Sequence, residues 1–347
     1  MRAFLCIIML IQINKVLITF IGIGRIKLNK NFYDVSVIMA TFNPVWNKCI
    51  FTLKSIIKQK NIKLELIVVD DGSSDALFDK YRYFFEVNNF SDFILIGHET
   101  NQGTVRNYYK GLQEASGKYI KLISPGDALY NENTLSDWVD RLEESGRRWS
   151  FAESVYYSEI NNSVKLIKGK AAPRLIECYK KDAFDVCRWN YVVLEDIPLG
   201  ASILCDRLLF SEYLVEIIDK VIYAEDLTFM LIMYDGIRPY YYPESCIIYE
   251  FGRGVSTSVE KKWQGLFRAD LASAEHIITK KTSVDDFQVK IKKSLLNMLS
   301  GSEKRKRIIK NTRKGGLKKV LRYRMCPRMT SCNITAIGSW WKEYERH

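Results

Sequence analysis

One short stretch, residues 66–75, restricts the fold of this chain more than any other. It reads Leu-Ile-Val-Val-Asp-Asp-Gly-Ser-Ser-Asp, an apolar run that ends abruptly in two carboxylates and a glycine. A continuous apolar run bounded by turn residues is typical of a strand that is buried on both faces, as in a parallel sheet. In open α/β sheets, ligands bind at the carboxyl ends of such strands. Asp70 and Asp71 are therefore expected at a ligand-binding edge, for a nucleotide or for a metal.

Similar apolar runs alternate with helical patterns along this part of the chain. Strands are predicted over residues 35–40, 64–69, 93–96 and 118–123. The segments between them predict helices, one over residues 73–87 with Ser74 or Asp75 as its N-cap. Strand and helix alternate at the spacing of βαβ units, which predicts an α/β fold. Its central sheet should be mostly parallel and Rossmann-like, with helices on both faces.

The composition is that of a folded protein with one unusually basic segment. The chain has 347 residues, 47% of them hydrophobic, and a formal net charge of +12. Residues 304–324 contain eleven Lys or Arg and no acid. Such a segment favours phosphate-rich partners, either anionic lipid or nucleic acid. The eight cysteines form no Cys-x-x-Cys pair and only three histidines occur, so a structural zinc site is not expected.

The amino-terminal segment allows three interpretations. Residues 3–23 are strongly apolar but are interrupted by Gln12, Asn14 and Lys15. A spanning helix needs about 20 apolar residues without a central charge. The segment is a poor membrane anchor, an interfacial segment, or an extension that the fold does not need. The charge near its middle favours a peripheral or dispensable segment over a true span.

Polar residues follow the predicted strands at the positions where chemistry is expected. Thr41 and Asn43 follow the first strand, Asp70 and Asp71 the second, and Asp127 the fourth. Since these loops share one edge of a parallel sheet, residues far apart in sequence should converge there. The chain has neither a Gly-x-x-x-x-Gly-Lys-Ser/Thr phosphate loop nor a complete dinucleotide fingerprint, which weakens ordinary ATP and NAD interpretations.

Four ordered segments carry a resemblance to a known family. They are Val-Ser-Val-Ile-Met-Ala-Thr-Phe-Asn (35–43), Val-Val-Asp-Asp-Gly-Ser-Ser-Asp (68–75), Asn-Gln-Gly with Arg-Asn (101–107), and Gly-Lys-Tyr-Ile (117–120). In order and spacing they resemble glycosyltransferase family 2, strongly to about residue 130 and more loosely to about residue 258. The resemblance implies a GT-A fold, a nucleotide-sugar donor (a UDP-sugar), a divalent cation, and inversion at the anomeric carbon.

The resemblance implies a donor-binding role for residues of the first three segments. Asp71 would accept a hydrogen bond from the uracil edge, with Asp70 as its neighbour. The other residues with an implied place at the nucleotide or its phosphates are Thr41, Asn43, Asn101, Gly103 and Arg106. Each has a plainer alternative: Asn43 begins a turn before a proline, Asp71 belongs to ordinary turn chemistry, and Asn101 with Gly103 forms only a turn.

The implied metal site departs from the family pattern. Relatives end the fourth strand in Asp-x-Asp or Asp-x-Asp-Asp, whereas this chain has Ser-Pro-Gly-Asp at 124–127. Only Asp127 remains to bind Mn²⁺ or Mg²⁺. One carboxylate, the donor's diphosphate and water are reasonable ligands for a hard cation, which would neutralise the leaving nucleoside diphosphate. The reduced motif leaves metal independence open, and the alternative for Asp127 is a cap or turn residue.

A second chemical signal lies downstream, where Glu225 and Asp226 precede an apolar helical run. The pair resembles the family's Glu-Asp motif on the acceptor side. An inverting transfer needs a base that removes the proton of the attacking hydroxyl on the face opposite the leaving group. Asp226 is the expected catalytic base, with Glu225 as its substitute or as an acceptor-binding group. The alternative is that both acids only favour a helix amino terminus.

Two regions beyond these motifs have weaker signals. Residues 149–157 and 164–167 suggest strands or a hairpin, and the region up to residue 222 is expected to determine acceptor specificity. Residues 249–257 resemble a segment that closes over the donor in relatives, with Arg253 between two glycines that let its guanidinium reach the diphosphate. An ordinary surface turn is the alternative. The basic stretch with interleaved apolar residues predicts binding to an anionic membrane surface.

The sequence therefore predicts three regions: an apolar extension (residues 1–33), a GT-A domain (34–258, with a nucleotide-sugar half to residue 130 and an acceptor half after it), and a helical, basic region (259–347). The predicted function is inverting transfer of a hexosyl group to a glycan acceptor, lipid-linked, in O-antigen, capsule or other surface-polysaccharide assembly. A cytoplasmic position at the inner face of the plasma membrane is expected, and nucleic acid is not an expected partner. The alternative is a non-catalytic nucleotide-sugar binding or scaffolding protein.

Overall fold

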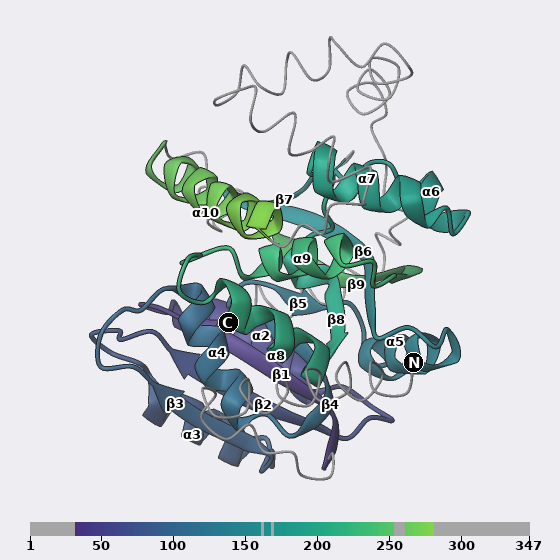
Figure 1. Cartoon of the computed structure of the whole chain (residues 1–347). Coiled ribbons are helices and arrows are strands. Elements are labelled where there is room, and N and C mark those ends of the chain that lie inside the picture. Colours follow the sequence, from purple (N-terminus) through teal and green to yellow (C-terminus); the bar gives the residue numbers. More distant parts are fainter. Residues whose placement is uncertain (1–31, 161–162, 168–169, 253–260, 281–347) are drawn as a thin grey trace, which may run out of the picture.

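The computed structural model describes residues 32–160, 163–167, 170–252 and 261–280 (Figure 1). Three predicted features, the apolar segment 3–23, Arg253 and the basic segment 304–324, lie outside the described residues. Among the described residues, no helix combines the length and the apolar character needed to cross a bilayer.

The first part of the chain alternates strand and helix, as the sequence predicted. Its elements are β1 (Tyr33–Thr41), α2 (Trp46–Ile57), β2 (Leu64–Asp70), α3 (Phe78–Val87), β3 (Phe93–Gly97), α4 (Thr104–Glu114) and β4 (Gly117–Ile123). The four strands pair in parallel in the order β3-β2-β1-β4. This arrangement places the carboxyl ends of β1, β2 and β4 at one edge of the sheet.

The second part extends the same sheet with mixed pairing. Its elements are β5 (Ala128–Leu129), α5 (Thr134–Glu144), β6 (Trp149–Ile160), β7 (Ser163–Leu166), α6 (Glu177–Lys180), α7 (Phe184–Leu194), η1 (Gly200–Ser202), β8 (Ile203–Asp206), α8 (Arg207–Ile217), η2 (Glu225–Leu227), α9 (Thr228–Tyr234), β9 (Tyr240–Glu250) and α10 (Lys261–Lys280). The sheet continues from β4 as β8-β6-β9-β5, and β7 pairs with β6. The predicted hairpin is confirmed, because β6 and β7 are antiparallel neighbours.

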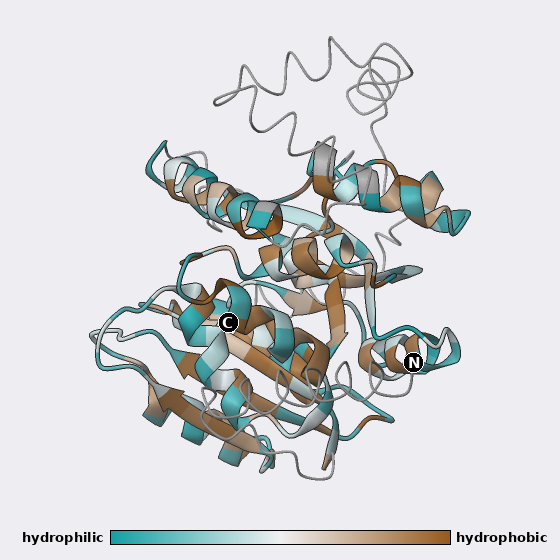
Figure 2. Cartoon of the chain, in the orientation of Figure 1, coloured by the Kyte–Doolittle hydropathy of each residue, from teal (hydrophilic) through white to brown (hydrophobic). Residues whose placement is uncertain are grey.

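The central strands are buried on both faces, which is why they read as continuous apolar runs. All seven residues of β2 are buried. Along β1, Ile38 packs into one apolar layer with α4 and α8, whereas Val37 and Met39 pack into the other with α2 and α3. Figure 2 shows the apolar colour concentrated on the strands and on the inward faces of the helices. Helices on both faces of one curled, mixed sheet confirm the predicted α/β architecture.

The helix predicted over residues 73–87 begins later than expected. α3 starts at Phe78, and its N-cap Leu77 has a left-handed φ of 57° and no side-chain cap. Ser73 instead donates from its backbone N–H and its hydroxyl to Asp70, at 2.7 and 2.6 Å. Asp75 accepts the N–H of Leu77 at 2.9 Å and so closes a short turn. The predicted cap at Ser74 or Asp75 is wrong, because the polar groups of this loop bind the end of β2 or one another.

Candidate active site

A cavity of about 600 Å³ opens at the carboxyl edge of the parallel strands. Its size is within the usual range for small-molecule sites. The acidic and amide side chains that line it are Asp71, Asn101, Asp127, Glu225 and Asp226. These five are all residues that the sequence predicted for the site. Thr41, Asn43, Asp70 and Gly103 belong to the surrounding loops, and Arg106 is not part of the lining.

Asp70, at the end of β2, holds the first two loops together. It is 2% exposed, and it accepts hydrogen bonds from the hydroxyls of Thr41 at 3.0 Å and Ser73 at 2.6 Å. The Ser73 hydroxyl in turn accepts the backbone N–H of Asn43, which has a left-handed φ of 45°. These contacts fix the positions of the loops after β1 and β2. Asp70 and Thr41 therefore support the loops at the edge of the cavity without lining it.

Asp71 holds the turn before α4 from a distance in sequence. Its two carboxylate oxygens accept the backbone N–H groups of Gln102 at 2.7 Å and Gly103 at 2.9 Å. Burial raises the pKa of Asp71, although these two hydrogen bonds act in the opposite direction. Gly103 has a φ of +90°, and a Cβ there would lie 2.4 Å from a side-chain carbon of Ile222. The turn at 101–103 thus needs a glycine, and it meets the downstream loop directly.

Arg106 points away from the cavity. Its guanidinium pairs with Asp219 at 2.9 Å, and the two side chains are 48% and 77% exposed. An exposed pair of this kind contributes little to stability.

Asp127 lies after β4 at the floor of the cavity. One of its carboxylate oxygens accepts the N–H of Glu250 at 3.0 Å, and its carbonyl accepts the hydroxyl of Thr52 at 2.6 Å. Burial raises the pKa of Asp127 to about 7. The preceding Gly126 has a φ of +101°, and a Cβ there would lie 2.4 Å from a carboxylate oxygen of Glu250. A side chain at position 126 would therefore be strained by this backbone conformation, and it would also meet Glu250.

Lys121 is a functional candidate that the sequence interpretation missed. It lies on β4, is fully buried, and donates from Nζ to the carbonyls of Leu122 at 2.6 Å and Ala201. Burial lowers its pKa to about 7, while the charges of Asp127 and Glu225 oppose that shift. The available signal was a single lysine in an otherwise apolar strand, at a position where the strand is buried on both faces.

Glu225 and Asp226 form the short 3-10 turn η2, which leads into the buried helix α9. Burial raises the pKa of both carboxyls, the charge of Asp226 raises that of Glu225 further, and the charge of Asp270 adds to the rise of both. Gly200 of η1 packs against this turn, and a Cβ there would lie 2.9 Å from the Cβ of Asp226. A carboxylate of raised pKa that faces a cavity is suited to accept a proton near neutral pH.

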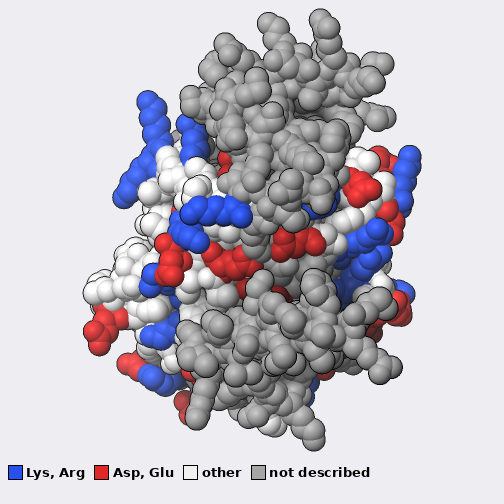
Figure 3. Space-filling view, viewed as in Figure 1, with Lys and Arg blue, Asp and Glu red and all other residues white. Residues whose placement is uncertain are grey.

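Helix α10 supplies one wall of the cavity through Lys262, Trp263 and Phe267. The ring of Trp263 meets that of Tyr223 edge to face, with centroids 5.5 Å apart and an interplanar angle of 89°. α10 crosses next to α9 in the upper part of Figure 1. In the same orientation, Figure 3 shows that the exposed side chains around α10 are largely basic, with acidic side chains towards the middle of the face.

A divalent cation has few protein ligands here. Among the described residues, no group of three or more His, Cys, Asp or Glu side chains is arranged to hold a metal. The Asp127 carboxylate has one oxygen bound to the N–H of Glu250, which leaves the other for a ligand in the cavity. The residues therefore fit an oxygen-bound cation only if the substrate and water supply most of its ligands.

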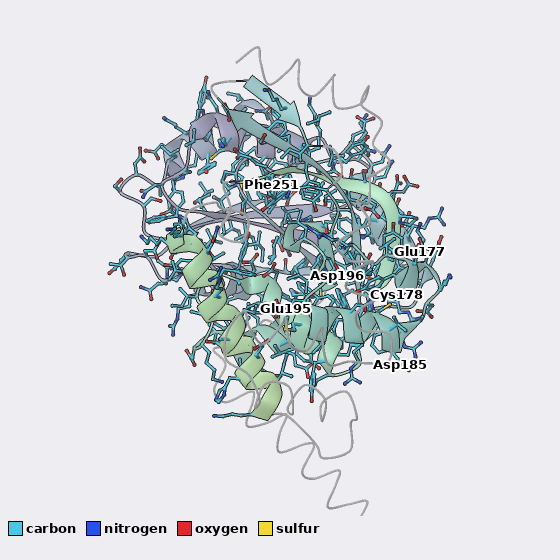
Figure 4. All side chains as sticks on the ribbon, turned by 90° about the horizontal axis from the view of Figure 1, so that it is seen from above. Glu177, Cys178, Asp185, Glu195, Asp196 and Phe251 are labelled. Atoms are coloured by element: carbon cyan, nitrogen blue, oxygen red, sulfur yellow. The ribbon has the colours of Figure 1, made fainter. Side chains whose placement is uncertain are left out.

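The region of α6 and α7, expected to determine acceptor specificity, lies on the other side of the molecule from α10. Figure 4 labels Glu177 and Asp185 there, from α6 and α7. Asp196 accepts the backbone N–H groups of Arg174 and Leu175, both at 2.8 Å, and so fixes the chain before α6. Among the cavity-lining residues, none comes from α6 or α7.

Comparison with known proteins finds glycosyltransferases among the relatives of part of this chain. Residues 36–193 match the model of Glycosyl transferase family 2. An "Uncharacterized glycosyltransferase" of Rickettsia bellii is 26% identical over 150 residues, which cover 41% of this chain and 21% of that protein. A "PGL/p-HBAD biosynthesis glycosyltransferase" of Mycobacterium bovis is 31% identical over 103 residues, which cover 29% and 38%. The chain thus spans well under half the length of these relatives.

A solved structure supports the fold. The mannosyltransferase PcManGT from Pyrobaculum calidifontis, determined with GDP-Man and Mn²⁺, superposes with a TM-score of 0.51. The alignment covers 90% of this chain and 88% of that one at 15% sequence identity. At this identity the likeness concerns the arrangement of the elements, which is that of a GT-A glycosyltransferase.

Proposed function

We propose that this chain is an inverting glycosyltransferase that moves a hexosyl group from a UDP-sugar to a hydroxyl group of a glycan acceptor. The observation that carries the proposal is the convergence of two groups of residues on one cavity. Asp71 and Asn101 come from loops of the first part of the chain, and Glu225 with Asp226 from the turn η2. This convergence supports a donor site and a base that act on one reacting carbon.

The nucleotide occupies the side of the cavity formed by the loops after β1 and β2. Asp71 keeps the turn at 101–103 in place and presents its carboxylate to the uracil edge, beside Asn101. Thr41, Asn43 and Asp70 fix the shape of that side. Arg253, which lies outside the described residues, is proposed to reach the diphosphate when the donor is bound.

The chemical step is one displacement at the anomeric carbon. The bond from this carbon to the diphosphate oxygen breaks, a bond to the acceptor oxygen forms on the opposite face, and the hydroxyl proton passes to Asp226. The raised pKa of Asp226 makes it a stronger base than an ordinary aspartate. The charge of Asp226 raises the pKa of Glu225, which is the second candidate for contact with the acceptor.

The leaving diphosphate brings negative charge into a cavity that already contains four acidic side chains, Asp71, Asp127, Glu225 and Asp226. We propose that Asp127 holds Mn²⁺ or Mg²⁺ at this point. Such a cation would neutralise the leaving nucleoside diphosphate. Lys262 is the basic side chain in the described lining and provides further compensation at the cavity wall.

The acceptor is proposed to be a lipid-linked glycan in surface-polysaccharide assembly at the inner face of the plasma membrane. The basic segment 304–324 supports this proposal through its charge alone. Deletion from Lys304 onward should weaken binding to vesicles that contain anionic lipid. Unchanged binding would remove the membrane part of the proposal and leave the catalytic part intact.

A donor screen tests the proposed activity. The purified chain is incubated with common UDP-sugars and Mn²⁺, and the release of UDP is measured with and without candidate glycan acceptors. Release with one donor is the expected result. UDP binding without release from any donor would instead favour the alternative, a nucleotide-sugar binding or scaffolding protein. The reduced set of acids at 124–127 is the observation that favours this alternative.

A further inference from the structure

Helix α10 lies beyond the residues matched by the family model, yet one of its side chains reaches the loop that carries the candidate base. Asp270 is 3% exposed and accepts three backbone N–H groups. One oxygen accepts that of Ile222 at 2.9 Å, and the other accepts those of Tyr223 at 2.7 Å and Ala224 at 3.0 Å. These are the three residues directly before Glu225.

This loop needs such a partner. The backbone N–H groups of residues 222–224 precede η2 and have no partner within it, so they have to find acceptors elsewhere. A carboxylate that accepts three N–H groups is a strong acceptor, since hydrogen bonds to charged groups are stronger than those between neutral groups. Asp270 therefore determines where the turn at Glu225 and Asp226 begins.

The other side of the same loop contacts the donor half. The carbonyl of Ile222 accepts the N–H of Val105 at 3.0 Å, and Gly103 packs against Ile222. Gly103 is itself held by Asp71. A continuous path of backbone contacts thus runs from the proposed uracil-binding carboxylate through the amino end of α4 to the loop, and from the loop to Asp270.

We propose that Asp270 is a positioning residue for the transfer reaction, which holds the Glu225–Asp226 turn in register with the donor-binding side of the cavity. This inference rests on the proposed function, because it assigns α10 a part in the same site. Two backbone partners act on the loop from opposite sides, α4 and Asp270. Loss of the Asp270 contacts should leave the donor side in place but allow the turn that carries Asp226 to move.

The charge of Asp270 has a second effect. It adds to the influences that raise the pKa values of Glu225 and Asp226. The other titratable groups that face the pair are Lys121 of β4, whose charge lowers the pKa of Glu225, and the phenols of Tyr108 on α4 and Tyr191 on α7. A neutral side chain at 270 should therefore lower the pKa of the base.

The conservative substitution Asp270→Asn separates these effects. An amide oxygen still accepts from the loop, but the charge is gone and fewer strong acceptors remain. We expect UDP affinity within about threefold of the parent protein and a kcat that falls about tenfold to a hundredfold, because small displacements of a catalytic group are costly. The rise of activity with pH should move to lower pH. Asp270→Ala should lower kcat further, and Arg268→Gln, on the exposed part of the same helix, should change neither property.

Wild-type kcat together with an unmoved pH profile in Asp270→Asn would overturn the inference. A readout that needs no turnover keeps it testable if no donor is found. Hydrogen–deuterium exchange of residues 222–227 should be faster in Asp270→Asn than in the parent, with Arg268→Gln as the control. Unchanged exchange in this segment would overturn the positioning role. Absent turnover with faster exchange would instead contradict the proposed function and leave the positioning role standing.

Discussion

The carboxylates on the two sides of the cavity differ in what surrounds them. On the donor side, Asp70 and Asp71 accept hydrogen bonds from hydroxyls and backbone N–H groups of neighbouring loops. On the opposite side, Glu225 and Asp226 lie next to each other in one turn, and burial dominates the rise in their pKa values. The same residue type thus occurs in two environments around one cavity.

The difference indicates that the donor-side carboxylates fix the loops of the site, whereas Glu225 and Asp226 are suited to proton transfer. The hydrogen bonds from Gln102 and Gly103 favour the charged form of Asp71 and fix its position, although burial still raises its pKa. A carboxylate that burial and a like charge disfavour keeps a stronger affinity for a proton. The donor side should therefore respond to mutation in its affinity for the nucleotide, and the opposite side in turnover and in its dependence on pH.

The largest expected effect belongs to Asp226. Asp226→Asn should lower kcat about 10²- to 10⁴-fold, the usual contribution of a general base. The affinity for UDP, measured by calorimetry, should stay unchanged, because the donor side is intact. In the parent, activity should rise with pH as Asp226 loses its proton, through a pKa above the ordinary range of aspartate. A collapse of UDP affinity in the variant would break the comparison, since Asp226 would then belong to the donor side.

The next effect concerns Asp71. Asp71→Ala removes the acceptor for the N–H groups of Gln102 and Gly103, so the turn before α4 should loosen. UDP affinity should fall about tenfold or more, as expected when hydrogen bonds to a charged group are lost. Asp75→Ala is the matched control, because Asp75 is an exposed aspartate of the same loop that accepts one N–H. Equal affinities of the two variants for UDP would contradict the assignment of Asp71 to the nucleotide.

A smaller effect is expected for stability at Lys121. Its pKa in the folded protein is about 7, against 10.5 as the ordinary value. Between these values the unfolded chain binds a proton that the folded chain does not, so the free energy of unfolding should rise with pH across this window. Lys121→Met should reduce that rise by roughly 1–3 kcal/mol, a discounted share of the shift. Chemical denaturation at pH 7 and pH 9.5 measures it.

Lys118→Met provides the control for this experiment, since Lys118 lies on the same strand but is exposed and pairs with Glu143. Its rise of stability with pH should equal that of the parent. An unchanged rise in Lys121→Met would mean that Lys121 keeps its charge in the folded state, with a counter-charge on the cavity floor.

The sequence predicted the donor side better than the opposite side, for a physical reason. Strand ends and the turns that follow them are local features, so the edge that holds Thr41, Asp71 and Asp127 was expected from apolar runs alone. The delayed start of α3 was missed because Asp70 captures Ser73 across the loop, which no local propensity reveals. Lys121 and Asp270 were missed because their partners lie far away in sequence, Ala201 for the first and residues 222–224 for the second.

The smallest effect is expected for Arg106. It tests whether this residue belongs to the donor side at all. The family resemblance assigns Arg106 to the donor side, but its guanidinium pairs with the exposed Asp219, and it is absent from the cavity lining. Arg106→Ala should lower the free energy of unfolding by at most about 1 kcal/mol, as for other exposed pairs. UDP affinity should change less than about twofold. A tenfold loss of UDP affinity, with Asp219→Ala unaffected, would mean that Arg106 leaves its partner when the donor binds. The donor side would then rearrange when the nucleotide binds.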